Sequence, residues 1–172
     1  TLFVCGLATD RAADGTAFER FSDQGPLALL PMGRDYGAIC AVANADAARV
    51  RALDDEAYRD CFQQRFGWRA GRFERVGMRS AHPIARVLAE RICAPRALLL
   101  GNAAQTIHPL GAQGFNLGLR DALALAERVG AGADAGAPEL LADYVQARRE
   151  DRERTLAFSD GLARVTANAS TS

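Results

Sequence analysis

The sequence predicts an α+β protein in which an antiparallel sheet with one or two helices precedes a further strand and further helices. Three observations predict this class. Residues 1–44 alternate between short apolar runs and turn residues, which is typical of consecutive antiparallel strands. Residues 45–64 and the segment after Pro138 have the apolar spacing of helices. Between them, residues 96–129 read as a strand, a glycine-rich turn and a helix.

The first segment contains four expected strands, at residues 1–9, 16–21, 27–31 and 36–42. Asp14-Gly15 is a typical hairpin signal, so it predicts that the first two strands pair across a tight turn. All the connections are short, and short connections join antiparallel neighbours. An antiparallel sheet of this kind has one face available for a ligand.

Two helices are expected after the strands. The first covers residues 45–53, and the second begins at an N-cap formed by Asp54 or Asp55 and ends at Gly67. Aromatic residues recur at helical spacing along the second helix, which indicates packing against a core rather than a cofactor site. They are Tyr58, Phe62 and Phe66.

The second half of the chain is organised around residues 96–129. The apolar run at residues 97–100 predicts a buried strand, and a turn-rich segment containing Pro109 follows it. A helix is expected from near Gly114. Its predicted buried face carries Phe115, Leu119, Ala122, Leu123 and Ala126. A strand, a glycine-rich turn and a helix start aim bare backbone N–H groups at a bound group, so we expect a flat electron-rich or anionic ligand there.

The remaining segments have simpler interpretations. Residues 130–136 contain a G-x-G, but no strand precedes it and no helix opening follows, which excludes a dinucleotide fingerprint. Pro138 fits the first turn of another helix. The charged run at residues 148–154 predicts a solvated helix face with i,i+4 ion pairs, with a partner surface as the alternative. Residues 168–172 are expected to be frayed.

Composition narrows the class of protein. The 172 residues have a formal net charge of zero, which argues against a nucleic-acid partner. No apolar run approaches the roughly 18 residues of a membrane span, and no signal-peptide pattern opens the sequence. The cysteines lie in apolar contexts without metal-ligand spacing, so we expect reduced thiols and a cytoplasmic protein, with a structural disulfide as the alternative. They are Cys5, Cys40, Cys61 and Cys93.

Two histidines, His82 and His108, are the candidates for acid–base chemistry. Each stands before or near a proline in an expected turn, where a structural role is the commoner one. No Ser-His-Asp set, carboxylate pair or metal cluster can be assembled from residues so placed, so we expect no metal site.

An ordered motif spans residues 101–126. It reads GNAAQTIHP over residues 101–109, continues with GAQGFNLG over residues 111–118, and ends with the pairs Asp121-Ala122 and Leu125-Ala126. This motif resembles the second flavin motif of the FAD-dependent aromatic-ring hydroxylases. It is most similar to the ubiquinone-biosynthesis branch, in the group of 2-octaprenyl-6-methoxyphenol hydroxylases, where Asn and Gln replace the wider family's usual Asp and His.

The resemblance implies a flavin site with FAD as cofactor. The implied chemistry is reduction by NAD(P)H or another electron donor, reaction with O2 to a flavin C4a-hydroperoxide, and transfer of oxygen to a phenol. Pro109 would be catalytic, with its carbonyl on the oxygen side of the flavin. The implied cofactor-binding residues are Gly101, Asn102, Ala103, Pro109, Gly111, Ala112, Gln113, Gly114, Phe115 and Asn116.

One position within the motif departs from the family. Ala112 stands where the family usually has glycine. If the position needs a positive φ, alanine would be strained there; if it only needs close approach, a methyl group fits.

The G-x-G-x-x-G unit that holds the ADP half of FAD does not occur in this sequence. We therefore expect the C-terminal portion of such an enzyme. Residues 1–94 would belong to the substrate domain, and residues 95–172 would supply the last strand and helices of the FAD-binding domain. Alone, the chain is expected to be inactive and to bind FAD weakly.

The resemblance also implies the partners. They are a prenylated phenol and O2, with a ubiquinone-biosynthesis complex or peripheral contact at the inner membrane as further expectations. Two other hypotheses stay open at this point. One is a non-enzymatic chain that binds a prenylated phenol or a protein. The other is a related flavin hydroxylase with a soluble aromatic substrate.

Overall fold

The computed structural model describes residues 1–22, 24–130 and 134–167. The chain forms two compact units: one comprises Thr1–Ile84 with Thr166 and Ala167, and the other comprises Ala85–Val165. The predicted domains, residues 1–94 and 95–172, stay a prediction. The expected frayed end at residues 168–172 and the middle of the expected loop at residues 130–136 lie outside the described residues.

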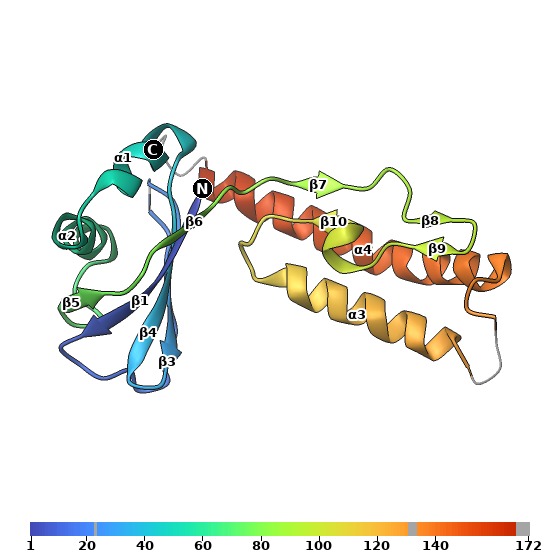
Figure 1. Ribbon diagram of the computed structural model, residues 1–172, viewed down its shortest axis with the longest axis horizontal. Helices are drawn as coiled ribbons and strands as arrows, with labels where there is room; N and C mark the ends of the chain where they lie inside the picture. Colours follow the sequence, from blue (N-terminus) through green and yellow to red (C-terminus); the bar gives the residue numbers. More distant parts are fainter. Residues whose placement is uncertain (23, 131–133, 168–172) are drawn as a thin grey trace. The chain divides into compact units, whose positions relative to one another are not determined.

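The first unit is built on an antiparallel sheet (Figure 1). Its strand order is β2-β3-β4-β1-β5, and β6 also pairs with β1. This sheet and its helices confirm the predicted α+β class. The strands are β1 (Leu2–Thr9), β2 (Phe18–Arg20), β3 (Leu27–Met32), β4 (Asp35–Ala41), β5 (Phe73–Val76) and β6 (Ser80–His82).

The predicted hairpin at Asp14-Gly15 is wrong. Strand β1 pairs with β4 on one side and with β5 and β6 on the other, while β2 pairs with β3. The Ala13 N–H donates to the Arg34 carbonyl at 2.9 Å, so this segment passes the β3–β4 turn on its way to the far edge of the sheet. Asp14 makes only a local turn, in which its Oδ1 accepts from the Thr16 N–H at 3.0 Å.

Two helices pack on one face of this sheet, α1 (Asn44–Ala52) and α2 (Asp55–Phe66). The Asp54 carboxylate caps α2 by accepting from the Ala57 N–H at 2.8 Å, and Gly67 ends the helix at φ +84°, as predicted. The predicted aromatic stripe is buried. The rings of Tyr58 and Phe62 stack at 4.0 Å, and they join alternate residues of β1, β3 and β4 in one apolar core.

The other face of the sheet is apolar as well. Val4, Ile39 and Ala28 lie opposite one another on three neighbouring strands and are half-buried. Leu30 and Met32 extend this face along β3 and are exposed. The described residues of this unit therefore leave an apolar sheet surface open.

The second unit contains a long loop segment and two helices, α3 (Gln113–Arg128) and α4 (Pro138–Ala167). Figure 1 shows α3 and α4 running alongside each other. Helix α4 begins at Pro138, as predicted. The loop segment forms two small antiparallel pairs and one helical turn. These are β7 (Val87–Leu88) with β10 (Gln105–Thr106), β8 (Cys93–Ala94) with β9 (Ala97–Leu98), and η1 (Gly101–Ala103).

The predicted buried strand at residues 97–100 is wrong in extent and burial. Strand β9 covers only Ala97 and Leu98, and both Ala97 and Leu99 are exposed. Among the described residues β9 pairs with β8 alone, so it is a short two-stranded ribbon rather than a strand inside a larger sheet.

The predicted buried face of α3 is also wrong. Phe115 is 79% exposed, and Leu119 and Leu123 are about half exposed. The buried residues of α3 are Leu117 and Asp121, on the side that contacts η1. The periodicity of the sequence correctly located the apolar stripe of α3. The covered face of the helix is a different one, on which Asp121 accepts a hydrogen bond from η1.

Three further observations concern side chains that could carry chemistry. Cys5 and Cys40 are buried, Cys61 and Cys93 are half-buried, and all four are free thiols. Within the described ranges, no group of three or more His, Cys, Asp or Glu side chains could hold a metal ion. No described helix is long and apolar enough to cross a membrane.

Candidate cofactor site

The candidate site is the segment from Gly101 to Asn116 in the second unit. It begins with the η1 turn, continues through β10 and an irregular loop, and ends in the first turn of α3. The exposed residues of the segment include Asn102, Ala103, Pro109, Ala112, Phe115 and Asn116. All the residues that the sequence proposes for the cofactor therefore belong to one unit, and many of them are open to solvent.

Three residues of this segment have a left-handed backbone. Gly101 has φ +53°, Gly111 has φ +77° and Ala112 has φ +50°. A Cβ at position 111 would lie 2.9 Å from Cε1 of Phe158, so a larger residue there would have to displace that exposed ring. The two alternatives for Ala112 are thereby decided: the position does adopt positive φ, which costs a non-glycine residue about 1–2 kcal/mol. Strain of this kind is concentrated at functional sites.

The N-terminus of α3 directly follows Gly111 and the strained Ala112. The helix begins at Gln113, one residue before the predicted start, and its N-cap residue Ala112 supplies no side-chain hydrogen bond. The Asn116 amide donates to the Ala112 carbonyl at 3.4 Å, and the Gln113 amide donates to the Gly111 carbonyl at 2.9 Å. Neither side chain caps an N–H group, so the positive end of α3 is free for an electron-rich ligand.

The backbone around His108 and Pro109 is fixed by local hydrogen bonds. The Pro109 carbonyl accepts from the Ala112 N–H at 3.0 Å, which uses one of its two lone pairs. The His108 Nδ1 accepts from the Leu110 N–H at 3.3 Å, and the His108 carbonyl accepts from the Ser159 hydroxyl at 3.1 Å. Burial lowers the pKa of His108, partly offset by Asp160. His108 thus shapes the loop through its Nδ1 and its carbonyl, and burial favours its neutral form.

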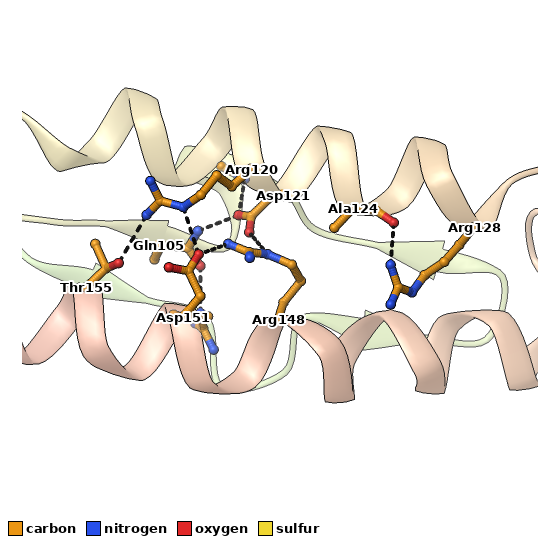
Figure 2. Close-up of polar contacts among 10 residues, drawn as sticks. Gln105, Arg120, Asp121, Ala124, Arg128, Arg148, Asp151 and Thr155 are labelled. Carbon is orange, nitrogen blue, oxygen red and sulfur yellow. Dashed lines mark hydrogen bonds and ion pairs between the residues drawn. The ribbon is translucent and has the colours of Figure 1, made fainter.

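A buried polar network stands behind this loop, and the sequence did not predict it. In Figure 2, Asp121 lies between Gln105 and Arg148. The Asp121 carboxylate accepts from Arg148 Nε at 2.9 Å and from Gln105 Nε2 at 2.8 Å. Arg152 Nε donates to Gln105 Oε1 at 2.7 Å. The one available signal was an Asp directly before the apolar run at residues 122–126.

The prediction of a solvated face for residues 148–154 needs correction. Arg148 is buried against Asp121, and it also donates to Asp151, which in turn pairs with Arg120 of α3. Burial alone would lower the pKa of Arg148, but the hydrogen bonds to the two carboxylates raise it above its ordinary value. The predicted i,i+4 form is found in the exposed pair of Arg154 and Glu150.

The residues present fit a flavin. A flavin is flat, and its reduced ring is electron-rich, so it suits a free helix N-terminus and a glycine turn that exposes backbone N–H groups. The family model described as an FAD binding domain matches residues 7–159. The chain belongs to this family.

Two relatives have a similar sequence. The ubiquinone hydroxylase UbiL of Rhodospirillum rubrum is 36% identical over 98% of this chain and 40% of its own length. The ubiquinone hydroxylase UbiM of Neisseria meningitidis is 32% identical over 84% of this chain and 32% of its own length. The chain thus spans less than half the length of these relatives.

One solved structure shows the same fold. PqsL from Pseudomonas aeruginosa, described as a probable FAD-dependent monooxygenase, superimposes with a TM-score of 0.73. The match has 20% sequence identity and covers 97% of this chain and 48% of PqsL. Because the family binds FAD, FAD is the cofactor assigned to this site.

Proposed function

We propose that this chain supplies the flavin-ring side of the site in an FAD-dependent monooxygenase that hydroxylates a prenylated phenol of ubiquinone synthesis. The observation that carries the proposal is the uncapped N-terminus of α3 directly after the left-handed pair Gly111-Ala112. The names of UbiL and UbiM support the pathway. In this proposal residues 1–94 belong to the substrate domain and residues 95–172 to the FAD-binding domain.

Each part of the loop has a role toward the flavin. The N–H groups of Gly114, Phe115 and Asn116 would donate to the electron-rich end of the ring, where a helix terminus stabilises an anion by about 0.3–2 kcal/mol. The turn formed by Gly101, Asn102 and Ala103 would hold the ribityl chain, with the Asn102 amide accepting from a hydroxyl.

The loop between these two parts would line the oxygen side of the ring. Pro109 is exposed and its ring fixes φ, so it would present a rigid surface without an N–H donor to that side of the flavin ring. Gly111, Ala112 and Gln113 set the direction in which α3 begins. When bound, the flavin supplies activation of O2 and delivery of one oxygen atom to the phenol ring, with NAD(P)H or another donor as reductant.

The first unit supports the proposed substrate class. Its sheet has an open apolar face formed by Val4, Ile39 and Leu30, among others. Such a surface suits a ring with a prenyl chain better than a small charged phenol, because burial of apolar area stabilises binding at about 25 cal/mol per Å². A membrane-resident substrate also implies peripheral contact with the inner membrane or with a ubiquinone-synthesis complex.

The proposal is tested with the native protein that carries this sequence. It is expected to purify with bound flavin and, given NAD(P)H and isotopically labelled O2, to place one labelled oxygen on a prenylated phenol. A colourless preparation, or a label that stays out of the ring, would contradict the proposal. A preference for phenols without the prenyl chain would favour a soluble aromatic substrate instead.

Two variants at one position link the activity to the loop. Gly114→Pro removes an N–H from the first turn of α3, where the helix itself does not use it. We expect flavin affinity to fall by roughly 10-fold or more, the loss expected for a hydrogen bond to a charged group. Gly114→Ala is the control, because its N–H remains and its Cβ would meet only Ile107, at 3.7 Å.

A further inference from the structure

The η1 turn and α3 touch through their backbones. A Cβ on Gly118 would lie 3.2 Å from the Cα of Gly101, and a Cβ on Gly101 would lie 3.6 Å from the Cα of Gly118. These two glycines allow the helix to run directly behind the turn. A side chain three residues after Gly118 lies on the same face of α3 and can therefore reach the start of η1.

Asp121 is the residue at that position. Its side chain is buried, with the residue 2% exposed, and three donors converge on its carboxylate. They are Arg148 Nε at 2.9 Å, Gln105 Nε2 at 2.8 Å and the Gly101 N–H at 3.4 Å. The carboxylate thus joins α4, the strand β10 that follows η1, and the first residue of η1.

Gln105 and Arg152 hold the other end of the same turn. Both ends of the Gln105 amide are used, since its Nε2 donates to Asp121 and its Oε1 accepts from Arg152 Nε. Arg152 also donates to the Ala104 carbonyl at 3.4 Å. Figure 2 shows the side chains of Asp121, Gln105 and Arg148 directed toward one another. The exposed residues Asn102 and Ala103 lie between two backbone groups that this network fixes.

We propose that Asp121 is a positioning residue for the flavin: it fixes the η1 turn from behind through the Gly101 N–H, so that the turn meets the cofactor already ordered. The inference rests on the proposed flavin site. A turn held in its bound conformation loses less freedom on binding, which strengthens affinity without any contact between Asp121 and the cofactor.

The position requires a carboxylate. An Asp accepts at two oxygens, whereas an Asn accepts at its oxygen and donates from its nitrogen. In Asp121→Asn, the new side-chain oxygen can still accept from Arg148. The new N–H₂ group then faces Gln105 Nε2 and the Gly101 N–H, and both of these are donors. The single variant therefore breaks the network and the Gly101 contact together.

A swap separates these two effects. In the double variant Asp121→Asn with Gln105→Glu, the new carboxylate at position 105 accepts from the new amide at position 121 and from Arg152. The oxygen of that amide accepts from Arg148. The side-chain network regains its hydrogen bonds and its one negative charge. The Gly101 N–H, however, still faces the N–H₂ donor of the amide at position 121. The double variant should therefore recover thermal stability without recovering the position of η1.

The experiment compares wild type, Asp121→Asn and the swap. Three readouts are needed: the melting temperature, the exchange rate of the Gly101 amide by NMR, and the flavin dissociation constant of the native protein. In the swap we expect most of the stability lost in the single variant to return, while Gly101 exchanges roughly 10-fold faster than in wild type and flavin binds roughly 10-fold more weakly.

Asp143→Asn is the matched control. Asp143 is an exposed partner of Arg128 between the same two helices, outside the network that holds η1. The same change of side chain there should leave Gly101 exchange and flavin affinity unchanged.

Three results would overturn the proposal. The swap could restore flavin affinity together with stability, which would give Asp121 a purely structural role. The swap could fail to restore stability, which would contradict the network. Gly101 exchange could stay at the wild-type rate in the swap. A wild-type protein that binds no flavin would defeat the proposed function, and Gly101 exchange in the swap would still decide whether Asp121 positions the turn.

Discussion

The two units of this chain are stabilised by different kinds of interior. In the first unit, an aromatic stripe on α2 packs on alternate strand residues, and Tyr58 and Phe62 are fully buried. In the second unit, α3 turns its apolar stripe to solvent and buries Asp121 against Arg148 instead. The chain thus has one interior organised by apolar burial and another in which a charge network is buried beside apolar residues such as Leu117 and Tyr144.

The difference shows what a hydrophobic pattern can and cannot establish. On α2 the pattern and the burial agree, because the sheet that covers this face lies in the same unit. On α3 an equally regular pattern lies on the exposed face, because the helix reaches η1 with glycines and a carboxylate. Helical spacing of apolar residues identifies an apolar face of a helix. Whether that face is buried depends on the element that packs against it.

The largest expected effect tests this contrast directly. Phe62→Ala should lower the free energy of unfolding by about 3–5 kcal/mol, because a fully buried ring leaves a cavity. Phe115→Ala, on the exposed stripe of α3, should change it by less than about 0.5 kcal/mol. Urea unfolding followed by circular dichroism measures both. Similar losses in the two variants would mean that the α3 stripe is buried.

The next effect concerns the charged run on α4. Arg148→Met should destabilise the second unit by about 3 kcal/mol, since it leaves Asp121 buried without its cation. Arg154→Met is the control, because its ion pair with Glu150 is exposed and such pairs contribute about 0–1 kcal/mol. If both variants unfold at the same urea concentration as the wild-type protein, residues 148–154 form the solvated face that the sequence predicts.

A smaller effect should appear in the pH dependence. Burial holds the pKa of His108 below its ordinary value, so the folded state favours the neutral ring. Stability is then fully present above about pH 6.5 and is lost as the pH falls through the lowered pKa. His108→Asn should remove this loss, because its amide oxygen can still accept from the Leu110 N–H and does not titrate. An unchanged pH profile in this variant would assign the loss to another group.

The sequence predicted the parts of the molecule whose signals are local. Asp54 and Gly67 mark the ends of α2 through cap chemistry, and Pro138 marks the start of α4. The glycines at positions 101 and 111 have the positive φ that a turn requires. Their role at the cofactor stays a prediction.

The features that the sequence missed depend on partners far along the chain. Strand β1 pairs with β4 rather than β2, which no turn signal at Asp14 could reveal. Asp121, Gln105 and Arg148 form one network from three distant segments, and each of them alone looks like an ordinary polar residue. The left-handed backbone of Ala112 was recognisable only as a departure from a motif.

The central claim is that the loop from Gly101 to Asn116 holds the flavin. The most direct measurement is the flavin dissociation constant of the native protein carrying Gly101→Ala, compared with Gly33→Ala. Gly101 has φ +53° and Gly33 has φ +67°, and neither added Cβ would meet an atom closer than 3.6 Å. Both substitutions therefore add a similar backbone strain of about 1–2 kcal/mol, one in the flavin loop and one in the β3–β4 turn. We predict that Gly101→Ala weakens flavin binding by roughly 10-fold while Gly33→Ala leaves it unchanged; equal dissociation constants in the two variants would contradict the claim.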